Sequence, residues 1–144
     1  MKIISGVLIV LALVAVIVPI FTDCQSQGRA IELPNGKTVP MKCHWTGIAS
    51  MAIGITLALL GGLIFFSKRR ETQRALSILG GVLGLFLVLM PTALIGVCAS
   101  SDMLCNSVMR PTLIFTGIAC IVASLVALSL SMRAETTPIA GQPA

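Results

Sequence analysis

The chain has 144 residues, of which 56% are hydrophobic and 10% are charged, and its mean hydropathy is +1.03. This composition excludes a water-soluble globular protein, because soluble domains carry roughly 25% charged residues. The lipid bilayer is therefore the expected solvent. The net charge of +5 does not indicate a nucleic-acid partner, since no basic patch interleaves with aromatic residues.

Four apolar runs divide the chain, and each is long enough to cross the hydrocarbon layer as a helix, which takes roughly 20 residues. They cover about residues 3–22, 45–66, 75–97 and 111–132. We expect an all-α, four-helix transmembrane bundle over residues 1–133 and a disordered cytoplasmic tail over 134–144, which lacks apolar surface. No run contains Asp, Glu, Lys, Arg or His, which argues against a self-sufficient pump or ion exchanger.

The first run shares some features with a cleavable signal peptide, because Lys2 precedes it and Ala12 and Ala15 are small. It is longer than the roughly 7–15 residues of a signal core, and no polar segment with an A-x-A-like site follows it. A lipoprotein signal at Cys24 is disfavoured by the acidic Asp23 before it. We therefore expect the first helix to be retained.

Basic residues beside the runs predict the orientation, because they concentrate on the cytoplasmic side. The loop between the second and third runs and both flanks of the domain are basic, through Lys68, Arg69, Arg70, Arg74, Lys2 and Arg133. The two other loops hold basic residues that acidic ones partly balance: Arg29, Lys37, Lys42 and Arg110 against Asp23, Glu32 and Asp102. The sequence thus predicts a multi-pass protein of the cell (inner) membrane with both termini in the cytoplasm.

The two predicted hairpins share features that suggest an ancient duplication. Each first helix has a proline near its outer end and a cysteine after it, Pro19 with Cys24 and Pro91 with Cys98. Each outer loop contains Met-x-Cys, at 41–43 and 103–105, and each second helix opens with Thr-Gly-Ile-Ala, at 46–49 and 116–119. Chance similarity between apolar sequences is the alternative. A true duplication would make the bundle two parallel-repeat hairpins about an axis along the membrane normal, and Pro91 is expected to bend the third helix.

Small residues recur every four positions along the second and fourth helices. The two stripes are Ser50, Gly54, Ala58 and Gly62, and Ala119, Ala123, Ala127 and Ser131. Small side chains allow close backbone approach, which drives helix association where lipid removes the hydrophobic effect between helices. Internal packing of the bundle is the first interpretation, and a face that docks on another integral membrane protein or on a second copy of the chain is the alternative.

Four of the five cysteines, Cys24, Cys43, Cys98 and Cys105, lie in or beside the two outer loops. The outer compartment is oxidising, so disulfides are expected there. Four cysteines permit three connectivities, and Cys24–Cys43 with Cys98–Cys105 closes the shortest rings. Cys120 lies within the fourth helix, where a lone thiol usually packs as a small apolar side chain.

Two other chemistries fit the same residues. Met41, Cys43, His44, Met103 and Cys105 offer soft ligands for copper(I) or zinc, although their spacing matches no fixed ligand pattern. Redox-active thiols are the second alternative, because four spans with two outer cysteine pairs are also the layout of quinone-linked disulfide oxidoreductases. The chain lacks the Cys-x-x-Cys element of those enzymes. We therefore expect structural disulfides, with His44 capping the second helix and no bound metal.

The motifs at 41–46, 91–98 and 103–105 together resemble a bacterial and archaeal family of small four-span membrane proteins known only as a domain of unknown function. The resemblance covers nearly the whole chain, and its specific elements are Cys-His-aromatic-Thr, at 43–46, and Cys-x₄-Met-x-Cys, at 98–105. It implies association with ABC-type permease systems, and it supplies no catalytic residue.

The sequence therefore predicts a non-enzymatic integral membrane subunit, pinned by disulfides at its outer face. Its expected partner is a larger membrane complex such as an ABC-type permease, or another copy of the chain. No cofactor is expected. The alternatives are a membrane thiol–disulfide oxidoreductase and, third, an outer-face site for copper or zinc.

Overall fold

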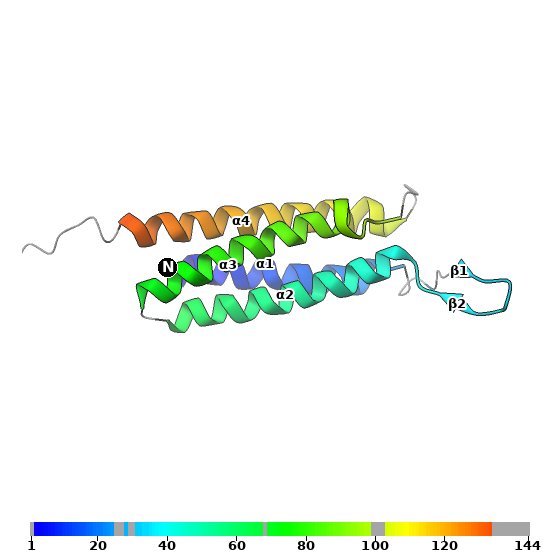
Figure 1. Ribbon diagram of the computed structural model, residues 1–144, viewed down its shortest axis with the longest axis horizontal. Helices are drawn as coiled ribbons and strands as arrows, with labels where there is room; N and C mark the ends of the chain where they lie inside the picture. Colours follow the sequence, from blue (N-terminus) through cyan, green and yellow to red (C-terminus); the bar gives the residue numbers. More distant parts are fainter. Residues whose placement is uncertain (1, 25–27, 29–30, 68, 99–102, 134–144) are drawn as a thin grey trace, which may run out of the picture.

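A computed structural model describes residues 2–24, 28, 31–67, 69–98 and 103–133 of the chain. Its four long helices run side by side as a bundle (Figure 1), and they are α1 (Lys2–Thr22), α2 (Lys42–Phe66), α3 (Arg70–Leu89) and α4 (Arg110–Arg133). Two π-helical segments adjoin them: η1 (Met90–Leu94) continues α3, and η2 (Cys105–Met109) leads into α4. The predicted all-α, four-helix fold is confirmed.

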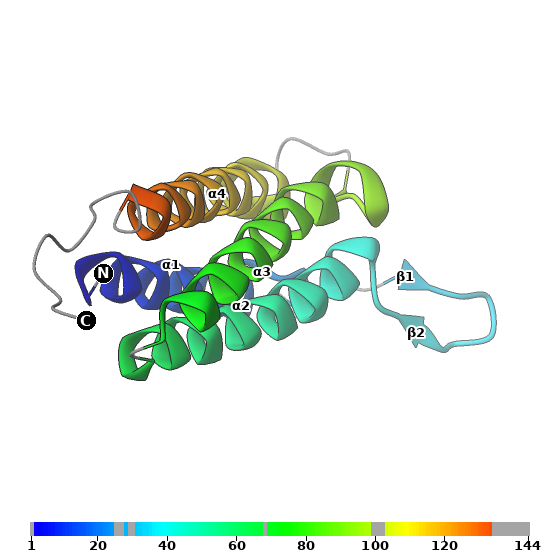
Figure 2. The ribbon, with the colours of Figure 1, turned by 60° about the vertical axis from the view of Figure 1, so that its left-hand side comes forward.

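A small β-hairpin extends beyond one end of the bundle (Figure 2). Its antiparallel strands are β1 (Ile31–Glu32) and β2 (Thr38–Val39), with Ile31 opposite Val39 and Glu32 opposite Thr38. Asn35-Gly36 lies in the turn between them, where Gly36 has a φ of 71°, a backbone conformation that glycine adopts without strain. All side chains of both strands are exposed, so the hairpin adds nothing to the core.

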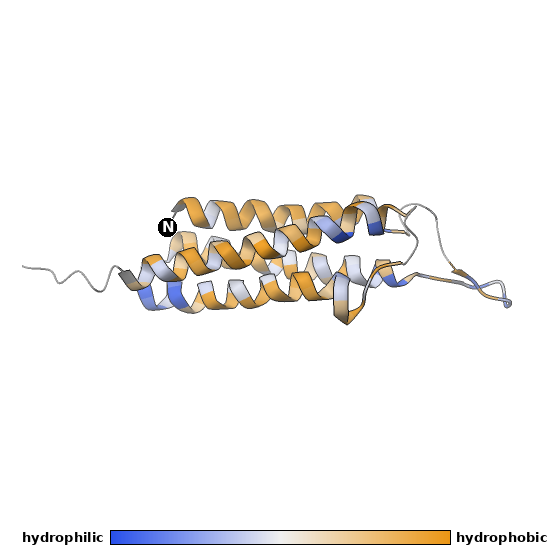
Figure 3. Cartoon of the chain, turned by 90° about the horizontal axis from the view of Figure 1, so that it is seen from above, coloured by the Kyte–Doolittle hydropathy of each residue, from blue (hydrophilic) through white to orange (hydrophobic). Residues whose placement is uncertain are grey.

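In the described part of the chain, four segments are long and apolar enough to cross a membrane: Ile3–Thr22, Lys42–Phe66, Arg70–Leu94 and Cys105–Met132. Hydrophobic residues cover the length of the bundle, and hydrophilic ones gather toward its ends (Figure 3). Large apolar side chains point outward, as at Leu59 (65% exposed) and Phe115 (72%). Such a surface suits lipid and not water, which supports a multi-pass membrane protein.

Two helices begin several residues before the apolar runs predicted for them. α2 begins at Lys42 and not near Trp45, so the first turn of α2 includes Cys43. α3 begins at Arg70 and not near Ala75, because hydrophilic residues also form helix where a span leaves the lipid. The expected disordered tail, 134–144, lies outside the described residues.

Glycines set how closely the two helices of each hairpin approach, with α1 packed mainly against α2 and α3 against α4. A Cβ on Gly54 would lie 2.7 Å from Val16 Cγ2, and one on Gly117 would lie 2.6 Å from Val88 Cγ2 and 2.8 Å from the Gly84 carbonyl oxygen. Neither position has room for a side chain. Close helix contact therefore depends on these glycines, as expected for association within lipid.

The residues of the two predicted small-residue stripes differ in how deeply they are buried. Ser50, Gly54, Ala127 and Ser131 are buried, Ala58, Ala119 and Ala123 are half-buried, and a Cβ on Gly62 would meet no atom within 4 Å. Along α2 the glycines that meet another helix are Gly47, Gly54 and Gly61, which are spaced by seven residues. Part of the predicted stripe on α2 therefore lies inside the bundle, and Gly62 lies against no other helix.

Pro91 lies in η1, where the helix widens from α to π. The amides of Ile95 and Gly96 both donate to the Met90 carbonyl oxygen, at 3.2 and 3.0 Å. Proline lacks an amide hydrogen and disturbs the α-helical ladder, and π-helical turns are one way in which helices absorb such a change. The expected irregularity at Pro91 thus takes the form of a π-helical turn.

Candidate functional site

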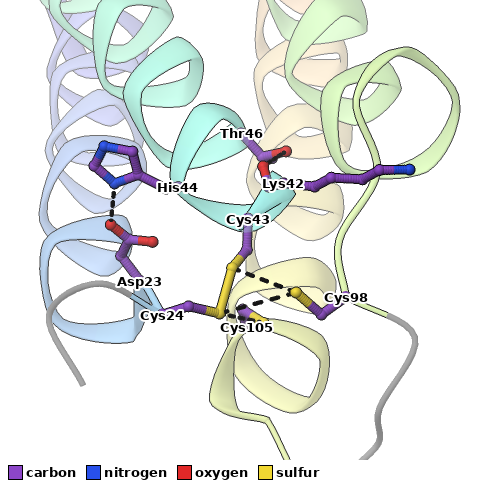
Figure 4. Close-up of polar contacts among 8 residues, drawn as sticks. All are labelled: Asp23, Cys24, Lys42, Cys43, His44, Thr46, Cys98 and Cys105. Carbon is purple, nitrogen blue, oxygen red and sulfur yellow. Dashed lines mark hydrogen bonds and ion pairs between the residues drawn. A yellow bond between two sulfur atoms is a disulfide. The ribbon is translucent and has the colours of Figure 1, made fainter. Parts of the chain in front are cut away.

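Each of the four helices brings one cysteine to the same end of the bundle, called here the cysteine end. Cys24 follows α1, Cys43 lies in the first turn of α2, Cys98 follows η1, and Cys105 opens η2. The four Sγ atoms all lie within 4.8 Å of one another (Figure 4). We call these four residues the cysteine cluster. The sequence predicted two separate pairs, whereas the structure gathers them at one point.

The bonding within the cluster is unequal. Cys24 and Cys43 form a disulfide, the pairing predicted for the first hairpin. Cys98 and Cys105 are free thiols, so the second predicted bond is not formed in this structure. Instead, Cys105 Sγ lies 3.3 Å from Cys24 Sγ, and Cys98 Sγ lies 3.5 Å from Cys43 Sγ. Both free thiols of the second hairpin thus contact the disulfide of the first.

Burial also differs among the four sulfurs. Cys43 and Cys105 are fully buried, Cys24 is 2% exposed, and Cys98 is half-buried. The buried members are continuous with the apolar core, where Met109 and other side chains pack on them. A reagent from the aqueous side therefore has its best access to the cluster at Cys98.

A short irregular segment positions Cys98. Gly96 has a φ of 79°, in the left-handed region that favours glycine, and the backbone turns there at the end of η1. The Thr46 hydroxyl of α2 donates to the Gly96 carbonyl oxygen at 2.6 Å. This bond ties the segment that carries Cys98 to the helix that carries Cys43, and it is a contact between the two hairpins.

His44 is held by Asp23 and not by the sulfurs (Figure 4). His44 Nδ1 lies 2.6 Å from Asp23 Oδ2, in a hydrogen bond that the imidazole donates to the carboxylate. Asp23 precedes Cys24, and His44 follows Cys43, so this pair and the disulfide close the same hairpin side by side. The role expected for His44, a polar residue at the start of α2, is compatible with this contact.

Among the described residues, the four clustered cysteines form the group that could hold a metal ion. Bonds of about 2.3 Å to a tetrahedral zinc place thiolate sulfurs about 3.8 Å apart, and the three contacts between the hairpins measure 3.3, 3.5 and 4.0 Å. The disulfide occupies two of the four ligands, so metal binding requires its reduction. Of the other predicted soft ligands, Met41 Sδ lies 4.0 Å from Cys98 Sγ, and Met103 packs against the apolar core to which Cys24, Cys43 and Cys105 belong.

A polar pocket of about 380 Å³ adjoins the cluster. It is lined by Pro91, Thr92, Gly96, Val97, Cys98, Asn106 and Arg110. Sequence reasoning did not find Asn106 or Arg110, because these residues meet Cys98 only through the folding of η1 and η2. The one available signal was the positive charge of Arg110 beside a loop that the sequence predicts to face outward. We call this cavity the Cys98 pocket.

The fifth cysteine lies apart from the cluster. Cys120 is fully buried within α4, and a Cβ added to Gly84 of α3 would lie 3.0 Å from Cys120 Cβ. Its side chain thus fills the contact between the two helices of the second hairpin. Cys120 serves as an internal control for thiol chemistry at the cluster.

The fold and the cluster define a class: small four-span helical membrane proteins with a sulfur centre at one end of the bundle. The chain belongs to the family described as a domain of unknown function, DUF4418, which matches residues 2–130. The family resemblance seen in the sequence is thereby confirmed. No curated protein and no solved structure gives a significant match.

Proposed function

We propose that the protein is a membrane thiol–disulfide oxidoreductase whose redox centre is the cysteine cluster. The observation that carries the proposal is the contact of two free thiols with one disulfide, at 3.3 and 3.5 Å. Thiol–disulfide exchange needs a thiolate that can reach a disulfide sulfur, and convergence of four helix ends supplies this without a Cys-x-x-Cys element. This ranks the oxidoreductase above the non-enzymatic subunit that the sequence favoured.

Exchange within the cluster moves the disulfide without any net transfer of electrons. The Cys98 thiolate attacks Cys43 Sγ, the Cys43–Cys98 bond forms, and the Cys24–Cys43 bond breaks. Cys24 leaves as a thiolate and takes up the proton that Cys98 released. Attack of Cys105 on Cys24 is the equivalent step on the other side, with Cys43 as the leaving thiolate. A substrate dithiol that reduces the cluster then loses two electrons and two protons to one protein disulfide.

The test is the rate at which the purified chain equilibrates with a small dithiol such as dithiothreitol. Thiols are trapped by alkylation at successive times and counted by mass spectrometry, with Cys120→Ser as the matched control. The proposal expects rapid exchange at the four clustered cysteines in both proteins. Four blocked thiols that exchange slowly, as buried structural disulfides do, would contradict it and support the inert subunit.

A second candidate function is the membrane subunit itself, and an apolar groove between α3 and α4 favours it. The groove has a volume of about 340 Å³ and lies away from the cysteine end. Gly81 lines it, as does Ser124, whose Oγ is buried without a hydrogen-bond partner in the described part of the chain. A transmembrane helix of another protein, such as an ABC-type permease subunit, would fill the groove with apolar side chains and hydrogen-bond to Ser124.

Gly81→Leu tests this candidate by filling the groove, with Gly62→Leu on open surface as the control. If a helix of another membrane protein docks there, Gly81→Leu releases the species that co-purifies from gently solubilised membranes, whereas Gly62→Leu retains it. A chain that purifies alone, or a complex that survives Gly81→Leu, would remove the support for a partner at this groove.

The orientation is part of the same proposal. We infer that both termini face the cytoplasm and that the cysteine end faces outward, because the basic residues gather at the opposite end. Tags at Lys2 and Ala144 should then be shielded in intact cells, and a probe at Asn35 in the β1–β2 turn should react from outside. External reactivity at Arg69 would reverse the arrangement.

A further inference from the structure

We propose that the Cys98 pocket is the substrate entrance of the cysteine cluster and that it takes a small thiol bearing a carboxylate. The inference rests on the function proposed above and deepens it. It assigns Cys98 as the cysteine that forms the bond to substrate, and Arg110 as the residue that selects the substrate by charge.

Access is the first argument. Cys24, Cys43 and Cys105 are at most 2% exposed, so an external thiol cannot approach their sulfurs along a straight S–S–S line without displacing the core. Cys98 is half-buried and lines the pocket directly. The Thr46 bond to the Gly96 carbonyl oxygen fixes this segment, so that Cys98 Sγ stays within 3.5 Å of Cys43 Sγ. One side of Cys98 thus meets the pocket, and the other meets the disulfide.

Charge is the second argument. Among the described residues that line the pocket, Arg110 is the one basic residue, and none is acidic. Asn106 also lines the pocket, and a side-chain amide can donate hydrogen bonds. A guanidinium beside an amide donor suits a planar carboxylate, which accepts charge-assisted hydrogen bonds. A cationic thiol would be repelled by the same residue, and a neutral one would gain nothing from its charge.

The bond-forming step is balanced within the cluster and its substrate. Internal exchange first gives the Cys43–Cys98 disulfide, as described above. The substrate thiolate then attacks Cys98 Sγ, the mixed disulfide between substrate and Cys98 forms, and the Cys43–Cys98 bond breaks. Cys43 leaves as a thiolate and takes the proton lost by the substrate thiol. No oxidant is consumed in this step.

The experiment compares three small thiols that differ mainly in charge: 3-mercaptopropionate, 2-mercaptoethanol and cysteamine. The full chain in detergent is incubated with each thiol, quenched with acid, and mapped by mass spectrometry for the cysteine that carries the adduct. Wild type is compared with Arg110→Gln and with Lys37→Gln, a matched control that removes a cation in the β1–β2 turn. Rates are expressed as variant over wild type for each thiol, which cancels differences in intrinsic thiol reactivity.

We expect the adduct on Cys98 and not on Cys24, Cys43 or Cys105. Arg110→Gln should slow 3-mercaptopropionate by about two- to fivefold, the range of an exposed charge pair, leave 2-mercaptoethanol unchanged, and speed cysteamine. Lys37→Gln should alter none of the three. An adduct on another clustered cysteine, or an equal effect of Arg110→Gln on all three thiols, would overturn the inference. If no thiol of any charge reacts with wild type, the proposed function itself fails.

Discussion

The two ends of the bundle are held together by different means. At the cysteine end, sulfur contacts, the Thr46 bond to Gly96 and the Asp23–His44 pair join residues of all four helix ends. At the opposite end, hydrogen bonds to backbone carbonyl oxygens join the helices within each hairpin, from Ser5 to Gly61 at 3.1 Å and from Arg74 to Ser131 at 3.1 Å. Sulfur contacts and polar side-chain pairs between helices are thus concentrated at the cysteine end. In the middle of the bundle and at the opposite end, the helices are held together mainly by close packing.

Removal of the disulfide is expected to lower the stability of the protein more than any other substitution proposed here. The double variant Cys24→Ser/Cys43→Ser should lower the free energy of unfolding by about 3 kcal/mol, because the bond closes a ring between residues separated by 19 positions. Thermal unfolding in detergent, followed by circular dichroism, measures the loss. Cys120→Ser is the control, since it changes one buried sulfur outside the cluster. Equal stability of the double variant and wild type would mean that the cysteine end does not depend on its covalent bond.

Some features of the bundle and of the cysteine cluster could be predicted from the sequence, and others could not. The four spans followed from apolar run length, and the Cys24–Cys43 pairing followed from ring size. The contact of Cys98 with Cys43 did not, because it depends on the π-helical turn at Pro91 and the left-handed backbone at Gly96. Neither feature has a periodic signal in a single sequence. The disulfide within the first hairpin was thus predictable from local pattern, whereas this contact between the two hairpins requires the fold.

Two glycines of α2 show that helix packing within a hairpin also cannot be predicted from sequence spacing alone. A spacing of four residues groups Gly54 with Gly62, but only Gly54 meets α1. The crossing of the two helices decides which turn of α2 reaches α1, and sequence spacing alone does not contain that geometry. This difference between two glycines of one helix can be tested directly.

Gly54→Leu is expected to have the second largest effect. The new Cβ would lie 2.7 Å from Val16 Cγ2 and 3.1 Å from the Ala12 carbonyl oxygen, and the backbone atom cannot move aside as a flexible side chain can. Overpacking of this kind costs about 1–3 kcal/mol, so the thermal midpoint should fall. Gly62→Leu, eight residues further along α2, meets open space and should leave it unchanged. If both variants keep wild-type stability, glycine packing does not hold the first hairpin together.

Loss of the Asp23–His44 pair is expected to have the smallest effect on stability, and it separates structural from metal chemistry. The two side chains are 14% and 24% exposed, so His44→Ala should lower the free energy of unfolding by only about 0.5–1 kcal/mol. His44→Gln keeps a hydrogen-bond donor to Asp23 and should recover part of that loss. Because the pair lies beside the disulfide, His44→Ala should also free the end of α1 and speed exchange at the cluster with dithiothreitol.

A metal held by the four thiols of the reduced chain would survive both substitutions, since the imidazole faces Asp23. Loss of stoichiometric copper or zinc in His44→Ala would instead make His44 a ligand, and the hydrogen bond to Asp23 would then orient that ligand and not merely close the hairpin.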